Sequence, residues 1–123
     1  MNTRKILLIG NPNVGKSAVF FRLTGAKIMI SNYPGSTVEF TQGYMKTGMG
    51  RAAVIDVPGT YTLEPTSKAE EVAVRMIKEG DLIVNVLDAT NLERNLYLTL
   101  QVLETGIPAV IALNMWDETS PTC

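Results

Sequence analysis

The eight residues 10–17, GNPNVGKS, form the Gly-x-x-x-x-Gly-Lys-Ser pattern of a phosphate-binding loop. The pattern follows the apolar run 6–9 and precedes a helical pattern, so the loop joins a strand to a helix. Its backbone N–H groups and the positive end of the helix dipole face one point, where Lys16 adds a full charge. Gly10 and Gly15 are expected where a Cβ would hinder an unusual backbone conformation or a close approach to phosphate. Such a loop predicts a nucleotide triphosphate tail as ligand, and a plain glycine-rich turn is the alternative.

The serine that ends the loop predicts a magnesium ion, because its hydroxyl is the group that coordinates Mg²⁺ in this pattern. We therefore expect the whole loop and the residue after it to contact the nucleotide. These residues are Gly10, Asn11, Pro12, Asn13, Val14, Gly15, Lys16, Ser17 and Ala18.

Length and composition are those of one soluble domain. A chain of 123 residues can bury a core. The net charge is −1 with both signs mixed, so no basic stripe indicates nucleic acid as a partner. Cys123 is the single cysteine and histidine is absent, which excludes an internal disulfide and a Cys/His metal cluster. No apolar run approaches the length of a membrane span, and we expect a cytoplasmic chain.

Strand and helix patterns alternate along the chain, which predicts an α/β fold with a mostly parallel sheet and helices on both faces. Nearly continuous apolar runs at 82–88 and 108–114 are typical of strands buried on both faces. Strands are expected at 4–9, 38–46, 51–57, 82–88 and 108–114, and helices at 16–24, 67–79 and 92–105. The two strands before and after 46–50 must form a hairpin, which predicts one antiparallel strand at the edge of the sheet.

Two of the predicted helices carry apolar stripes. Ser67 and Glu70 form a capping box at the start of the helix 67–79, and the helix 92–105 ends at Gly106. We expect both stripes to pack in the core: Val72, Ala73, Met76 and Ile77 in the first helix, and Leu92, Leu96, Leu100 and Leu103 in the second.

The segment DVPG at 56–59 ends the strand that is predicted beside the phosphate-loop strand. The carboxylate of Asp56 would therefore reach the Mg²⁺ region, through a coordinated water, and Gly59 could offer its N–H to the γ-phosphate. Asp-x-x-Gly is otherwise a common turn. Its position at a strand end, downstream of a phosphate loop, favours the functional interpretation.

The segment NMWD at 114–117 ends the last predicted strand, on the edge where open α/β sheets bind ligands. A carboxylate at Asp117 can accept from the two donors of guanine, whereas adenine lacks that donor pair. Asn114 and Asp117 therefore predict guanine as the base. The usual motif has Lys where Met115 stands, and the methionine stem can still cover the base. An ordinary turn is the alternative.

The segment 31–39, SNYPGSTVE, is polar and is interrupted by Pro34 and Gly35, so we expect a mobile loop without regular structure. Thr37 is the hydroxyl that could close over Mg²⁺ when a γ-phosphate is present, with Gly35 and Ser36 beside the nucleotide. Alternatively, Thr37 merely begins a strand.

These four elements in this order resemble a P-loop GTPase of the translation-factor class. Above all, the segments GNPNVGKS, NYPGSTVE, DVPGTY and DATNLERNLYLTLQVLETGIPAVIALNMWDE, which ends at Glu118, resemble the cytosolic GTPase domain of bacterial ferrous iron transport protein B, the FeoB family. The likeness covers nearly the whole chain. It implies a domain at the cytoplasmic face of the inner membrane that binds and hydrolyses GTP and regulates ferrous iron uptake by the membrane-embedded permease portion of the same protein.

The resemblance also implies roles for particular residues. Asn13 matches the residue that binds an activating K⁺ in potassium-dependent members, and Mg²⁺ would be held by Ser17, Thr37 and Asp56. Lys16, Thr37, Gly59 and Asn13 are then the residues expected to act in GTP hydrolysis. A plain turn role for Asn13 remains open.

The chain departs from the family pattern in two respects. The family domain continues past the Asn-x-x-Asp element with a further helix and strand, so we expect an incomplete GTP-binding domain at 1–118, an unstructured tail at 119–123, and an exposed sheet edge that favours instability or self-association. Thr60 stands where many GTPases have a water-orienting glutamine, so intrinsic hydrolysis is expected to be slow.

Two alternatives to this function are considered. A soluble GTPase of ribosome assembly usually has Asp-Thr-Pro-Gly and Asn-Lys-x-Asp, where this chain has Val57 and Met115. A guanine-nucleotide-binding module without turnover is the other alternative.

Overall fold

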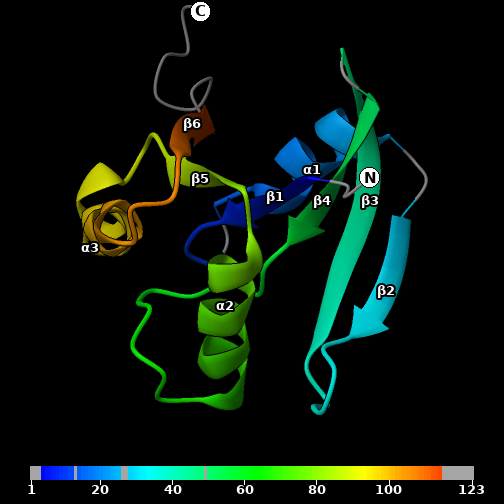
Figure 1. Ribbon diagram of the computed structural model, residues 1–123. Helices are drawn as coiled ribbons and strands as arrows, with labels where there is room; N and C mark the ends of the chain where they lie inside the picture. Colours follow the sequence, from blue (N-terminus) through cyan, green and yellow to red (C-terminus); the bar gives the residue numbers. More distant parts are fainter. Residues whose placement is uncertain (1–3, 13, 26–27, 49, 115–123) are drawn as a thin grey trace, which may run out of the picture.

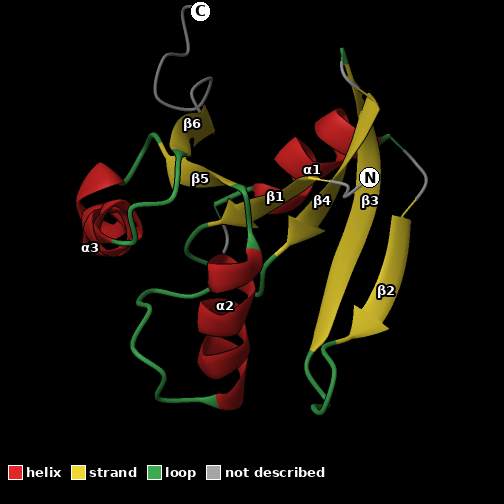
Figure 2. Ribbon diagram, viewed as in Figure 1, coloured by secondary structure: helices red, strands yellow, loops and turns green. Residues whose placement is uncertain are grey.

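The computed structural model describes residues 4–12, 14–25, 28–48 and 50–114, and they form a six-stranded sheet with three helices (Figure 1, Figure 2). The elements are β1 (Arg4–Ile9), α1 (Lys16–Thr24), β2 (Ile28–Asn32), β3 (Glu39–Thr47), β4 (Gly50–Asp56), α2 (Lys68–Glu79), β5 (Leu82–Asp88), α3 (Leu92–Glu104) and β6 (Ala109–Asn114). The strand order is β2-β3-β4-β1-β5-β6. β1 pairs in parallel with β4 and β5, and β5 with β6, whereas β3 is antiparallel to both its neighbours.

The helices cover the two faces of the sheet, and the alternation of side chains along β1 decides which face each residue serves. Leu7 and Ile9 pack with buried residues of α2 and α3, whereas Leu8 packs with Val14 and Phe20 of the loop and α1. Successive side chains of a strand point to opposite faces, so one short apolar run supplies both cores. The predicted three-layer α/β fold is confirmed.

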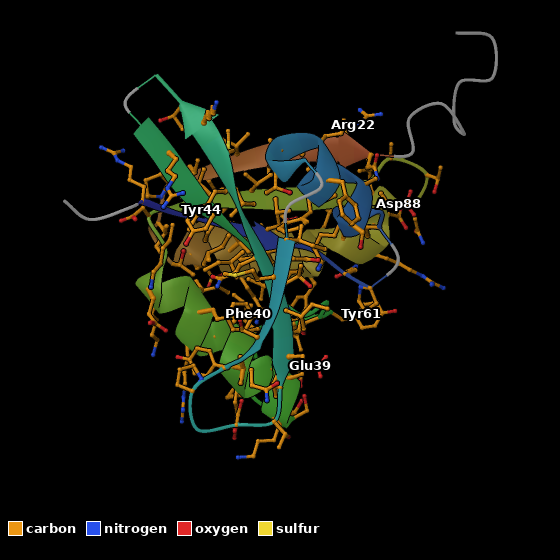
Figure 3. The ribbon with its side chains drawn as sticks, turned by 90° about the vertical axis from the view of Figure 1, so that its right-hand side faces the viewer. Arg22, Glu39, Phe40, Tyr44, Tyr61 and Asp88 are labelled. Carbon is orange, nitrogen blue, oxygen red and sulfur yellow. The ribbon has the colours of Figure 1, made fainter. Side chains whose placement is uncertain are left out.

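The antiparallel part of the sheet has one strand more than expected. The β3–β4 hairpin is confirmed, with Thr47 opposite Gly50, but β3 is not the edge strand because β2 pairs with it from Ile28 opposite Gly43 to Asn32 opposite Glu39. The sequence pattern missed β2 because this short strand leaves Ile30 68% exposed. Pairing with β3, rather than a buried face, supports its extended conformation. Figure 3 shows Phe40 and Tyr44 along β3.

The segment 31–39 is more regular than predicted, since its ends belong to β2 and β3 and only 33–38 forms a loop. Ser36 N–H donates to Tyr33 O (3.0 Å). Pro34 follows Tyr33, and Gly35 has φ +79°, the residue pattern of a type II turn. The Tyr33 hydroxyl donates to Glu79 Oε1 (2.7 Å) at the end of α2. This hydrogen bond raises the pKa of Tyr33 above its ordinary value and ties the hairpin loop to α2.

The start of α2 follows the prediction. Ser67 is the N-cap residue, and its hydroxyl accepts from Glu70 N–H (3.2 Å). The predicted apolar stripe of this helix, from Val72 to Ile77, is buried against the sheet.

The leucine stripe of α3 is oriented opposite to the prediction. Leu92, Leu96, Leu100 and Leu103 are 44–56% exposed in the described chain, and the helix buries Asn95, Leu98, Thr99 and Val102 instead. Periodicity shows that a helix has two faces but not which one meets the sheet. Here the inner face is partly polar because it lies against Asn85 of β5, whose amide donates to Thr99 Oγ1 (2.7 Å).

The expected burial of both faces holds for β5 but is wrong for β6. Ile83, Val86 and Leu87 are buried, whereas Val110, Ile111 and Leu113 of β6 are each about half exposed. The reason is topological, because β6 forms an edge of the sheet in the described part of the chain. None of the three helices there has the length and hydropathy that crossing a membrane requires.

Removing the N-cap hydroxyl of α2 tests the account of this helix. Ser67→Ala should lower the free energy of unfolding by about 1 kcal/mol, because the Glu70 N–H loses its acceptor. Chemical denaturation with urea measures the change. Ser67→Asp keeps an acceptor and is the matched control, so an equal loss in both variants would contradict the capping role.

Candidate functional site

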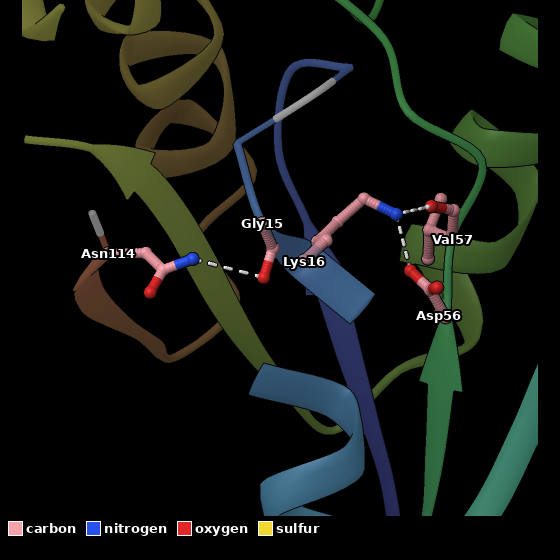
Figure 4. Close-up of polar contacts among 5 residues, drawn as sticks. All are labelled: Gly15, Lys16, Asp56, Val57 and Asn114. Carbon is pink, nitrogen blue, oxygen red and sulfur yellow. Dashed lines mark hydrogen bonds and ion pairs between the residues drawn. The ribbon is translucent and has the colours of Figure 1, made fainter. Parts of the chain in front are cut away.

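Three of the predicted motifs meet at one edge of the sheet (Figure 4). The phosphate loop follows β1, Asp56 ends β4, and Asn114 ends β6. These strands are parallel to one another through β1 and β5, so their carboxyl ends lie together. The arrangement brings together groups that are up to 100 residues apart in the sequence, the Asn114 side chain and the Val14 carbonyl.

The two glycines of the phosphate loop serve different purposes. Gly15 has φ +81°, a conformation that other residues rarely adopt, and its carbonyl accepts from Ala18 N–H (3.1 Å) to begin α1. Gly10 is needed for packing, because a Cβ there would lie 2.8 Å from Val86 O and 2.9 Å from Val14 Cγ2. The close approach at Gly10 is thus to β5 and to the loop's own valine.

Lys16 is the charged centre of the site. Its ammonium forms an ion pair with the carboxylate of Asp56 and donates to Val57 O (2.7 Å), as Figure 4 shows. The side chains of Lys16 and Asp56 are only 11% and 18% exposed. Each charge compensates part of the desolvation of the other. The Lys16 ammonium and the Asp56 carboxylate, which is predicted to approach Mg²⁺, are therefore close enough to contact the same magnesium–phosphate ligand.

Asn114 fastens the end of β6 to the phosphate loop. Its amide Nδ2 donates to Val14 O (3.0 Å) and to Gly15 O (3.1 Å), the second of which Figure 4 shows. The side chain thus holds the last residue of β6 beside the loop. Met115 and Asp117 of the NMWD motif lie outside the described residues.

The segment after β4 also touches the phosphate loop. Thr60 N–H donates to Gly10 O (3.1 Å), and a Cβ on Gly59 would lie 3.1 Å from Pro12 Cα. The Thr60 hydroxyl is directed elsewhere, to Thr62 O (2.7 Å) and Glu70 Oε2 (3.3 Å), and Thr60 is 4% exposed. Thr60 therefore has no hydroxyl free to orient a water in this conformation.

The remaining predicted residues fall into three groups. Ser17 and Ala18 are exposed in the first turn of α1, directly after Lys16. Gly35, Ser36 and Thr37 lie in the β2–β3 loop, at the end of the hairpin far from the phosphate loop (Figure 1), so the structure does not bring them to the other site residues. Asn13 lies outside the described residues.

The residues present fit a magnesium–phosphate ligand. The loop has a positive-φ glycine directly before the N-terminus of α1, where N–H groups and the helix dipole favour an anion. No acidic residue occupies the first turn of α1, so the phosphate oxygens would meet no repelling carboxylate from this helix. Asp56 would supply the oxygen ligand that Mg²⁺ prefers, together with the Ser17 hydroxyl on α1.

Sequence reasoning missed three contacts of this site. They are the hydrogen bond from the Lys16 ammonium to the Val57 carbonyl, the hydrogen bond from the Asn114 amide to the loop, and the hydrogen bond from Asn11 Nδ2 to Arg94 O (3.0 Å). A backbone carbonyl acceptor leaves no residue-type signal. The asparagines at positions 11 and 114 indicated hydrogen bonding, but the sequence did not show which groups they would bond.

Comparisons with known proteins agree on one family. The sequence model described as ferrous iron transport protein B matches residues 4–122. The chain is 50% identical over 117 residues to the "Fe(2+) transport protein A/Fe(2+) transporter FeoB fusion protein" of Porphyromonas gingivalis, with 93% of this chain and 14% of that protein covered.

Solved structures are similar as well. The G domain of the T. maritima FeoB iron transporter has a TM-score of 0.91 at 36% identity, over 99% of this chain and 78% of that one. A mutant S. thermophilus NFeoB bound to GDP has a TM-score of 0.88 at 46% identity, over 97% of this chain and 46% of that one. The chain spans 14–16% of the length of the curated relatives that it matches.

The hydrogen bonds around Glu70 predict a dependence of stability on pH. The hydroxyl of Thr66 above all, with smaller contributions from Ser67 and Thr60, holds the pKa of Glu70 below its ordinary value of 4.5, against a smaller opposing effect of burial. A lowered pKa in the folded state gives stability that is present above the ordinary value and is lost as the pH falls through the lowered one.

The free energy of unfolding should therefore fall more steeply between about pH 5 and pH 3 in the unmodified chain than in Glu70→Gln. Urea denaturation at each pH measures this slope. Glu71→Gln, which removes a carboxylate outside this network, is the control for loss of charge from the same helical turn. Parallel curves for the unmodified chain and Glu70→Gln would show that the network contributes nothing.

Proposed function

Because the chain belongs to the ferrous iron transport protein B family, we propose that it binds and hydrolyses GTP and serves as the switch that regulates ferrous iron uptake. The observation that carries this proposal is the convergence of Lys16, Asp56 and Val57 O beside a loop that Asn114 braces from the end of β6. This geometry suits a phosphorylated nucleotide with a base bound near β6.

Phosphate binding would change the partner of Lys16. In the described structure its ammonium contacts Asp56 and Val57 O, and a phosphate anion in the loop offers it a stronger, doubly charged acceptor. The Asp56 carboxylate is then free to hold Mg²⁺, together with Ser17 and, after closure of its loop, Thr37. Mg²⁺ supplies neutralisation of charge on the phosphate oxygens when bound. Gly59 N–H is the proposed donor to the γ-phosphate.

The base would be read by the segment that follows β6. Asp117 accepts from the two donors of guanine, and adenine would leave the carboxylate unpaired. The stem of Met115 covers the base face. Asn114, directly before this segment, is held to the phosphate loop by Nδ2 contacts of 3.0 and 3.1 Å.

Hydrolysis is proposed to be slow without further assistance. Two observations support this: the Thr60 hydroxyl is engaged by Thr62 O and Glu70, and the loop that carries Thr37 lies away from Lys16 and is tied to α2 through Tyr33. We propose that K⁺ held by Asn13 supplies additional positive charge at the transferred phosphoryl group.

The remaining parts of the function concern the longer proteins of the family. The matched region is a small part of the curated relatives, so the partner is proposed to be the membrane-embedded permease portion of a full-length protein. The domain would then lie at the cytoplasmic face of the bacterial inner membrane. The exposed apolar residues of β6 are compatible with self-association. The matching family model, ferrous iron transport protein B, favours this function over the soluble ribosome-assembly alternative.

Isothermal titration calorimetry with GDP, GTP and ATP, in Mg²⁺ and K⁺, tests nucleotide choice. Guanine nucleotides should bind at least about a hundredfold more tightly than ATP, because only guanine pairs the Asp117 carboxylate. Asn114→Ala should weaken GDP binding by about tenfold, since two loop carbonyls lose their donor, and Lys16→Ala should abolish it. Equal affinity for ATP, or unchanged binding by Lys16→Ala, would contradict the proposal.

Phosphate release under saturating GTP tests turnover and the role of potassium. Turnover should be faster in K⁺ than in Na⁺, and Asn13→Ala should lose this difference while still binding GDP. Asn32→Ala, at an exposed position of β2, is the control for loss of a polar side chain. A potassium response that survives in Asn13→Ala would refute the assignment of Asn13, and binding without any phosphate release would favour a non-catalytic module.

A further inference from the structure

Asn11 is a phosphate-loop residue whose side chain is turned into the protein, toward α3. It is 3% exposed, and its Nδ2 donates to Arg94 O (3.0 Å), 83 residues later in the chain. Its Oδ1 is buried and has no hydrogen-bond partner among the described residues. A buried amide with an unsatisfied oxygen is unfavourable for stability, so packing alone does not account for an asparagine at this position.

The acceptor of this bond belongs to the first turn of α3 (Leu92–Glu104). In an α-helix the carbonyl of Arg94 is also the acceptor expected for Leu98 N–H, four residues later. The Asn11 amide therefore shares an acceptor with the helix ladder itself. A displacement of Asn11 changes the hydrogen bonding of the first turn of α3 directly.

The inner face of α3 continues this polar contact. Asn85 Nδ2 donates to Thr99 Oγ1 (2.7 Å), and Thr99 Oγ1 donates to Asn95 O (3.0 Å). Asn85 and Asn95 also keep buried Oδ1 atoms without partners among the described residues. Directional bonds thus hold a large part of α3 in place, and such bonds depend on position more strongly than apolar packing does.

We propose that Asn11 is a positioning residue that couples the phosphate loop to the first turn of α3, so that nucleotide binding and the placement of α3 stabilise each other. The inference rests on the proposed binding of guanine nucleotide. When the loop closes on phosphate, its backbone is held in one conformation, and Asn11 transmits this restraint to Arg94 O. By linkage, the factor by which nucleotide binding stabilises the position of α3 is also the factor by which a displacement of α3 weakens nucleotide binding.

Hydrogen exchange followed by NMR, with GDP as the probe, tests the coupling. In the unmodified chain GDP should slow exchange of the Leu98 amide about fivefold more than exchange of the Ile77 amide in α2, which reports general stabilisation of the fold. In Asn11→Ala this additional slowing should disappear, and GDP affinity should fall by about the same factor of five.

Two further variants separate coupling from stability. Asn85→Ala removes another buried amide that bonds α3 and that has no hydrogen bond to the described residues of the phosphate loop, so it should keep the additional slowing at Leu98. Asn11→Leu has a similar shape, carries no charge and lacks the donor, and it should behave like Asn11→Ala, including where the alanine variant does not fold.

The outcomes are distinguishable. A Leu98 response in the Asn11 variants as large as in the unmodified chain would overturn the coupling while leaving guanine-nucleotide binding intact. Loss of the response in Asn85→Ala as well would show that any weakening of α3 has this effect, which also overturns it. Absence of GDP binding by the unmodified chain, measured by calorimetry, would overturn the proposed function and the coupling together.

Discussion

The contact on which the site depends joins the ammonium of Lys16 to the Asp56 carboxylate and the Val57 carbonyl. Lys16 follows β1, Asp56 ends β4 and Val57 comes directly after it, so the contact requires these strands to be parallel neighbours. The register places Leu8 opposite Asp56, which fixes both strand ends at one edge of the sheet. Backbone pairing thereby sets the distance between two charges that are 40 residues apart.

The same requirement explains which parts of the molecule could be predicted from sequence. The strand–loop–helix pattern around Lys16 and the motif at Asp56 depend on local sequence and on the rule that parallel strands bind ligands at their carboxyl ends. Both lie where they were expected. Thr37 was expected at the site as the hydroxyl that could close over Mg²⁺, but it lies in a hairpin loop whose turn is determined by Pro34 and Gly35.

The failures concern orientation and pairing, which a one-dimensional pattern does not contain. The strand at Ile28–Asn32 exists because β3 offers its free edge, although β2 buries little apolar surface. The leucines of α3 form a clear stripe, yet the helix turns Asn95 and Thr99 toward the sheet. The orientation of α3 is explained by its neighbours. The buried amides of Asn85 and Asn11 require polar partners, and α3 offers them Thr99 Oγ1 and Arg94 O.

Two kinds of contact therefore meet at the phosphate loop. Lys16 and Asn114 connect it to β4 and β6, where a nucleotide would lie, and Asn11 connects it to α3. A loop held at these three points is pre-organised for an anion. It also transmits a change in its occupancy to several elements of the fold.

The most direct test of the account is a crystal structure of the chain with a non-hydrolysable GTP analogue and Mg²⁺. The account predicts the phosphates inside the loop, Lys16 Nζ within hydrogen-bond distance of a phosphate oxygen instead of Asp56, and the guanine base beside the residues after Asn114. A loop without phosphate in crystals that contain the analogue elsewhere, or a Lys16 still paired with Asp56 beside bound phosphates, would contradict it.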